Sequence, residues 1–128
     1  LDRELLKSLY TRANLFLFPS VYDNAPIVVR EAAAARCPSV VVAGSNSAEG
    51  IIDNLNGYLT KNDPESLAQR VKEILADPQK LAAVGAKAEQ TIYRHWEQII
   101  DEVVARYREI ITEHRKKTTT FGPFPMVK

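Results

Sequence analysis

Two carboxylates in the first third of the chain stand at a spacing that could serve a polar ligand. Asp23 follows an apolar stretch, and Glu31 lies eight residues later, inside a predicted helix that begins at Pro26. Ionised carboxylates accept hydrogen bonds from hydroxyl groups. The start of the helix would also direct the backbone N–H groups of Ile27 and Val28 at an anion. The segment could therefore hold a ligand that carries both hydroxyls and phosphate.

A structural role for the same two acids is an alternative. Asp23 could cap the helix that follows it, and Glu31 could be a solvated helix residue paired with a neighbouring arginine. The spacing alone leaves both interpretations open.

The elements that would position these residues alternate between strand and helix. Residues 15–18 and 39–42 are short apolar runs that predict buried strands, and residues 27–36 predict a helix between them. A strand, helix, strand unit favours parallel pairing with a right-handed crossover. Ligands of open parallel sheets bind beyond the carboxyl ends of the strands, where Asp23 is expected. A further helix is predicted before the first strand by the spacing of Leu5, Leu6, Leu9 and Tyr10.

The rest of the chain predicts a third strand and three helices. A turn at 53–57, after a short helical turn near 48–52, leads into an edge-like strand at 58–60. Asp63-Pro64 and Asp77-Pro78 each predict a capped helix start. The last helix, residues 97–114, has an apolar side that we expect to be buried, made of Ile99, Ile100, Val103, Val104, Tyr107, Ile110 and Ile111.

These elements predict an α/β fold, a partial Rossmann-like parallel sheet with flanking helices. We expect a domain over residues 1–115 and an irregular tail over 116–128. Three strands are fewer than the usual six or so of a doubly wound sheet, and the chain starts with Leu1, so we expect further strands upstream of this sequence.

Composition excludes several classes of function. The 17 basic and 16 acidic residues give a net charge of +1, too little to predict a nucleic-acid partner. One cysteine, Cys37, fits a reducing compartment, and a cytoplasmic location is expected. The two histidines lie far apart in the sequence, and no metal site is predicted. The basic residues 115–117 could contact anionic lipid at the inner membrane surface, although a basic helix end also complements its own dipole.

The run PSVYDNAPIVVREAAAARCPSVVV resembles the signature region of the glycosyl transferases group 1, which are retaining glycosyltransferases of the GT-B fold. In that family a strand ending in Pro-Ser leads to an acid, seven residues, a glutamate and a second strand. Four later segments extend the resemblance to about residues 5–112: 48–51, 53–59, 63–68 and 95–97.

The resemblance implies that the chain is the donor-binding part of a glycosyltransferase. Glu31 would accept hydrogen bonds from the donor ribose, Asp23 would lie near the transferred sugar as the catalytic residue, and the N–H groups of Ile27 and Val28 would hold the diphosphate. The loop residues Asn24, Ala25 and Pro26 would complete the donor site.

The implied reaction moves a sugar from a nucleoside-diphosphate sugar to an acceptor hydroxyl with retention of configuration. It uses no cofactor and no obligatory metal. The acceptor domain and a basic pair that steadies the leaving group would lie upstream, so the fragment alone is expected to be inactive.

Two departures from the family pattern concern the same site. Asp23 replaces the more usual glutamate, and Asn24-Ala25-Pro26 replaces a glycine-rich stretch. Two alternatives to a glycosyltransferase are a non-catalytic α/β signalling module and a GT-B relative such as a sugar-nucleotide epimerase or a phosphorylase. A signalling module of the receiver type would have an acid directly at a strand end, which 18–20 and 42–44 lack.

Overall fold

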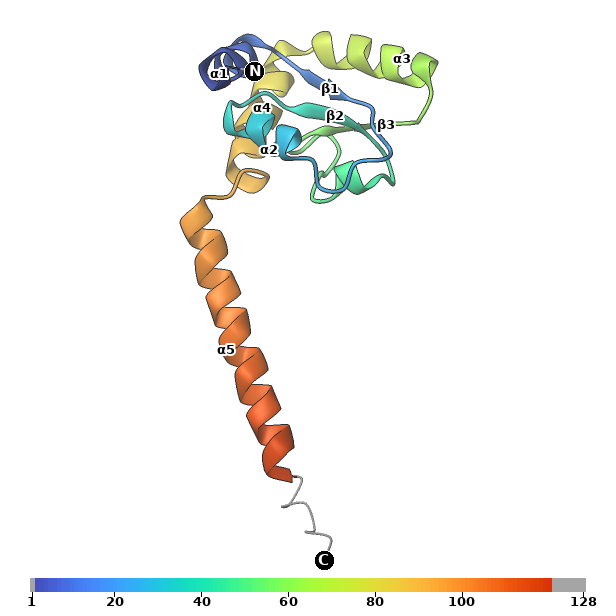
Figure 1. Ribbon diagram of the computed structural model, residues 1–128. Coiled ribbons are helices and arrows are strands. Elements are labelled where there is room, and N and C mark those ends of the chain that lie inside the picture. The colour runs from blue at the N-terminus through green and yellow to red at the C-terminus, as the bar shows by residue number, and fades with distance from the viewer. Residues whose placement is uncertain (1, 121–128) are drawn as a thin grey trace, which may run out of the picture. The chain divides into compact units, whose positions relative to one another are not determined.

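Three parallel strands form the centre of the fold. The computed structural model describes residues 2–120, and Figure 1 shows the order of their elements. The strands, in sheet order, are β1 (Phe16–Phe18), β2 (Ser39–Val42) and β3 (Tyr58–Thr60). Val40 of the central strand stands opposite Leu17 on one side and Tyr58 on the other. The predicted α/β class with parallel pairing is therefore confirmed.

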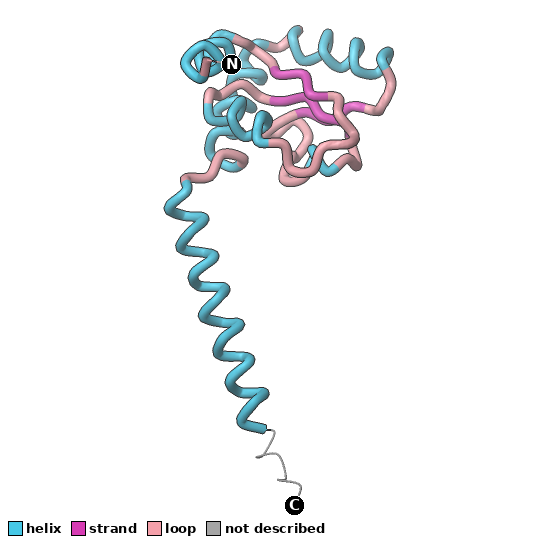
Figure 2. Tube along the Cα trace, viewed as in Figure 1, coloured by secondary structure: helices cyan, strands magenta, loops and turns pink. Residues whose placement is uncertain are grey.

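Helices cover both faces of this sheet, as the tube in Figure 2 shows. Those of the first compact unit, Leu1–Tyr93, are α1 (Arg3–Arg12), α2 (Ile27–Ala34), the short 3-10 helix η1 (Asn46–Ala48), α3 (Pro64–Leu75) and α4 (Pro78–Thr91). One core joins β2 and β3 to α3 and α4 through Val40, Tyr58, Ile74 and Leu81. The other joins α1 and α2 through Tyr10 and Ala32.

Cys37 lies in the second of these cores. Its side chain is fully buried beside Tyr10 and Ala32, and burial raises the pKa of its thiol to about 11. A thiol in that state is a small apolar group rather than a nucleophile.

The expectation of a buried first strand is wrong, because Phe16 and Phe18 are only half-buried and the residue between them is exposed. Leu17 is 45% exposed, whereas all four residues of β2 are buried. Leu17, Val40 and Tyr58 pair with one another across the three strands. Residues of α3 and α4 pack against Val40 and Tyr58, whereas Leu17 lies on the edge strand β1. The burial of a strand depends on its neighbours in the sheet, which its own apolar sequence does not reveal.

Capping aspartates start α3 and α4 as predicted. The carboxylate of Asp63 accepts a hydrogen bond from the backbone N–H of Ser66 at 2.7 Å, and that of Asp77 does the same from Lys80 at 3.0 Å. A proline follows each aspartate at the first helical position. The bond from Ser66 also lowers the pKa of the Asp63 carboxyl. At the start of each helix, an aspartate side chain thus accepts a hydrogen bond from a backbone N–H group that has no partner within the helix.

A glycine allows α4 to approach the connection between α2 and β2. A Cβ atom on Gly85 would lie 2.2 Å from the carbonyl oxygen of Arg36 and 3.3 Å from Cδ of Pro38. Arg36 has a positive φ of 59° and its Nε donates to Glu89 of α4 at 2.7 Å. The backbone contact at Gly85 therefore sets the distance between α4 and the connection from α2 to β2.

The second compact unit, Arg94–Lys128, contains the helix α5 (Trp96–Thr120). The predicted burial of its apolar side is wrong. Six of these side chains are between 38% and 62% exposed: Ile100, Val103, Val104, Tyr107, Ile110 and Ile111. In the described part of this unit, there is no other helix or strand against which this apolar side could pack.

The end of α5 also differs from the expected start of an irregular tail. The helix continues through residues 116–120, and the remainder of the predicted tail, 121–128, lies outside the described residues. Within residues 2–120, no helix combines the length and apolar character that crossing a membrane requires.

Substitution Gly85→Ala is expected to destabilise the first unit by about 1–3 kcal/mol, because the new methyl group overlaps the Arg36 carbonyl and the helix must shift. Helix propensity alone predicts the opposite sign, a gain of about 1 kcal/mol. Chemical denaturation followed by circular dichroism measures the difference.

The matched control is Ala83→Gly at an exposed position of the same helix, with an expected loss of about 0.5–1 kcal/mol from propensity. A stabilised Gly85→Ala protein would contradict the close contact.

Candidate functional site

Asp23 lies in the loop that leaves the carboxyl end of β1. Its carboxylate accepts a hydrogen bond from Oγ of Ser20 at 2.5 Å, and the same Oγ accepts one from the backbone N–H of Tyr22 at 3.3 Å. The acid is therefore held by its own loop. It does not cap the following helix, because Pro26 occupies the N-cap position of α2.

A second loop meets this one at the same edge of the sheet. Asn46, at the start of η1 after β2, donates from its side-chain amide to Oδ1 of Asn24. The hydroxyl of Ser47 donates to the backbone carbonyl of Ser20 at 3.4 Å. Sequence reasoning missed Asn46 and Ser47 as site residues. Their place directly after β2 was the available signal, since parallel strands end at one edge.

The start of α2 differs from the starts of the other α-helices in this unit. An aspartate accepts from the backbone at α1, α3 and α4, whereas Pro26 at α2 makes no side-chain capping bond. Ala25, just before it, has a positive φ of 46°. Pro26 was expected at the first helical position, but its ψ of 125° places it one residue before the helix, with Ile27 as the first helical residue.

A helix start without a capping side chain attracts negative charge. The first N–H groups of a helix lack partners within it, and the helix dipole is positive at that end. The groups of Ile27 and Val28 are in that position, while the N–H of Val29 donates to the Pro26 carbonyl at 3.2 Å. The loop at the carboxyl end of β1 thus presents an acid followed by a helix start that has no side-chain cap.

Glu31 lines a separate groove, between α1 and α2. The groove has a volume of about 470 Å³, and its walls include the cations Arg3 and Lys7 and the ring of Tyr10. Among the described residues Glu31 forms no ion pair, contrary to the structural interpretation of its sequence. Burial, and then the charge of Glu31, raise the pKa of Tyr10. The carboxylate is exposed and available to hydroxyl groups in this groove.

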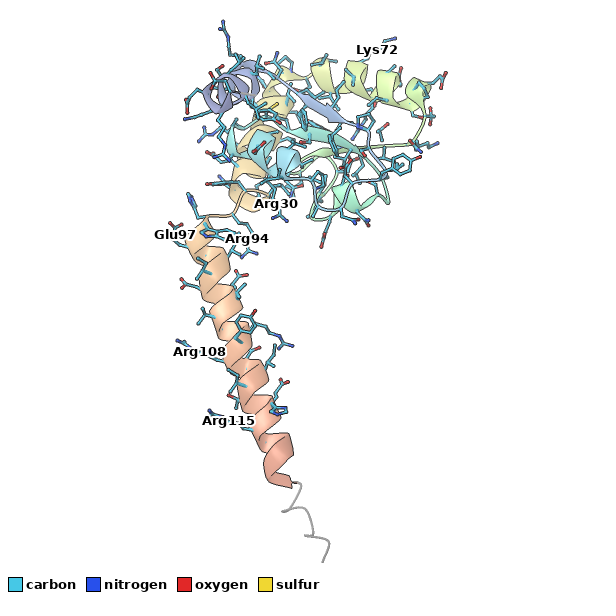
Figure 3. All side chains as sticks on the ribbon, viewed as in Figure 1. Arg30, Lys72, Arg94, Glu97, Arg108 and Arg115 are labelled. Carbon is cyan, nitrogen blue, oxygen red and sulfur yellow. The ribbon has the colours of Figure 1, made fainter. Side chains whose placement is uncertain are left out.

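The predicted site residues therefore occupy two neighbouring regions on α2 and its preceding loop. Asp23, Asn24 and Pro26 lie at the sheet edge, and Glu31 lies one helical turn farther on, facing α1. Arg30, labelled in Figure 3, extends from α2 and lines a small hollow with Asn46. No group of three or more His, Cys, Asp or Glu side chains able to hold a metal occurs in the part of the chain that the structure describes.

Comparison with known proteins assigns this arrangement to a family. Residues 1–91 match the family model of the glycosyl transferases group 1. An uncharacterized glycosyltransferase of Methanocaldococcus jannaschii is 32% identical over 108 residues, which are 82% of this chain and 28% of that protein. A D-inositol 3-phosphate glycosyltransferase of Mycolicibacterium smegmatis is 28% identical over 117 residues, 91% of this chain and 27% of that protein.

A solved structure agrees with these matches. The sucrose-phosphate synthase from Thermosynechococcus elongatus superimposes with a TM-score of 0.76 at 28% sequence identity, over 88% of this chain and 29% of that one. The chain thus spans less than a third of each of the proteins it resembles.

Inorganic phosphate at millimolar concentration is expected to shift the backbone amide resonances of Ile27 and Val28, because these donors are uncapped. The amides of Ser66 and Lys80 should move little, since a carboxylate already accepts from each. Heteronuclear NMR titration measures all four in one experiment. Equal shifts at the capped and uncapped helix starts would contradict a selective anion site on α2.

Proposed function

Because the chain belongs to the glycosyl transferases group 1 family, we propose that it binds the nucleoside-diphosphate sugar of a retaining glycosyltransferase. The observation that carries the proposal is the uncapped start of α2, which has an acid on either side of it in the sequence. The acceptor would be bound by other parts of the enzyme, since the relatives are more than three times as long as the segment they share with this chain.

The diphosphate would occupy the start of α2. A nucleoside diphosphate is multiply charged, and the N–H groups of Ile27 and Val28 would donate to its oxygens, aided by the helix dipole. Pro26 contributes no N–H group, so the donors to the diphosphate begin at Ile27. This arrangement supports binding of the phosphates by backbone rather than by a metal ion.

The nucleoside would extend from the diphosphate along α2 into the groove beside α1. Glu31 lies in that groove, where its carboxylate would accept hydrogen bonds from the two ribose hydroxyls. Arg3, Lys7 and the acid Glu4 also line this groove. The polar wall residues thus suit a ligand that carries several hydroxyl groups.

The sugar would extend in the other direction, toward Asp23. As the glycosidic bond to the diphosphate breaks, negative charge develops on the leaving phosphate and positive charge on the sugar. The fixed N–H groups of α2 would stabilise the first, and the Asp23 carboxylate, held by Ser20, would stabilise the second. Retention of configuration in this reaction is part of the proposal and is supported by the family resemblance.

Titration of the chain with UDP, GDP and ADP is expected to shift resonances from residue 23 to residue 31 with at least one of them. Replacement Glu31→Ala should weaken that binding roughly tenfold to a hundredfold, the usual effect of losing hydrogen bonds to a charged group. Heteronuclear NMR gives both the location and the affinity.

Glu65→Ala is the matched control, since Glu65 is an exposed glutamate in the first turn of α3. The Glu65→Ala variant should bind each nucleotide with the same affinity as the parent chain. The proposal is refuted if no nucleotide shifts the amides of Ile27 and Val28, or if the two glutamate variants bind equally well.

A further inference from the structure

The helix α5 carries apolar side chains that its own unit leaves exposed. Four of them follow one another at alternating intervals of three and four residues and are between 45% and 62% exposed: Ile100, Val103, Tyr107 and Ile110. This alternation places all four on one side of the helix, in the row through which two helices of a coiled coil contact each other. We name these four residues the apolar row.

The two flanks of the apolar row differ in character. Val104 and Ile111 extend the apolar surface on one flank, whereas Arg106 and Glu113 lie on the other and have opposite charges. Arg106 donates to Glu109 of its own helix at 2.9 Å, but an exposed pair of this kind has little energetic weight. Charged residues on the flanks of a coiled coil set its partner and its direction. A partner of α5 must therefore be apolar along the row and complement both charges.

A second copy of α5 meets both requirements when it runs in the opposite direction. In an antiparallel pair, the flank with Arg106 and Glu113 faces the same flank of the other copy. Arg106 of each copy then stands beside Glu113 of the other, in the register that sets Tyr107 opposite Ile110. The arrangement has two-fold symmetry, so every contact is made twice.

The charges along the helix favour the same direction. The first two turns carry acids such as Glu97 and Asp101, and the last turns carry bases such as Arg115 and Lys116. Figure 3 labels Glu97 near the start of α5 and Arg115 near its end. Antiparallel pairing brings the acidic start of one copy near the basic end of the other, whereas parallel pairing would place like charges together.

We propose that the chain associates with a second copy of itself through α5, as an antiparallel two-helix coiled coil formed by the apolar row. This inference goes beyond the proposed function and does not depend on it, because no residue of the candidate donor site belongs to α5. An anionic lipid surface selects basic helices and matches this face less well, since α5 carries as many acidic as basic side chains.

Sedimentation equilibrium of the full chain measures the association. The parent chain should reach twice the mass of a single chain at high concentration and dissociate on dilution. Val103→Asp places a charge in the apolar row and should weaken the association by about tenfold or more. Ala105→Asp is the matched control, an exposed residue on the opposite side of the same helix, and should associate as the parent chain does. Unchanged amide resonances of the first unit verify that this unit is folded in every variant.

An exchange of charges tests the antiparallel direction. Arg106→Glu and Glu113→Arg each place like charges together in a symmetric pair, so each variant alone should associate about tenfold more weakly than the parent chain. An equimolar mixture of the two should recover the parent association, because each chain then faces the opposite charge of the other. Added salt should reduce these differences.

Three results would overturn the proposal. The parent chain could remain single at every concentration, which would mean that another molecule or another part of a longer chain covers the apolar row. Val103→Asp and Ala105→Asp could associate equally well, or the mixture of charge variants could associate no more strongly than either variant alone.

Discussion

The complete burial of β2 is the constraint on which the remaining architecture depends. All four of its residues are buried, and it pairs in parallel with a strand on each side. A strand in this position needs helices on both faces, and parallel neighbours need crossover connections, which here are supplied by α2 and by the segment from η1 to residue 57. Both connections leave the sheet at one edge. The convergence of two polar loops there follows from the pairing of β2 and needs no separate cause.

The helices of the first unit use their starts in two different ways. Where Asp2, Asp63 and Asp77 accept from the backbone, the carboxylate satisfies the free N–H groups and stabilises the helix. At α2 the chain forgoes that stabilisation. The eight-residue helix is instead secured by burial of Val29, Ala32 and Ala33, so its open end can remain available to a ligand.

Much of the fold could be predicted from sequence because the signals are local. The Asp-Pro pairs, the β-branched run at β2 and the turn with Asn54 at a φ of 62° each depend on a few adjacent residues. Packing between distant segments could not be predicted from such local signals. Helix propensity assigns Gly85 only a weakening effect on its helix, whereas the structure places a carbonyl where a side chain would be. The apolar side of α5 predicted burial that its own unit does not provide.

The same distinction applies to the candidate site. Asp23 and Glu31 could be identified because they belong to one continuous segment. The position of Asn46 after β2 indicates the same sheet edge, but its pairing with Asn24 depends on the register of β1 against β2. The loop between β1 and α2 also lacks the glycine-rich stretch of the family pattern. Glycine lets a backbone approach a ligand and adopt positive φ, but the chain with Ala25 and Pro26 is stiffer and has one N–H fewer. A ligand at this edge of the sheet would therefore meet fewer backbone donors than it would at a glycine-rich loop.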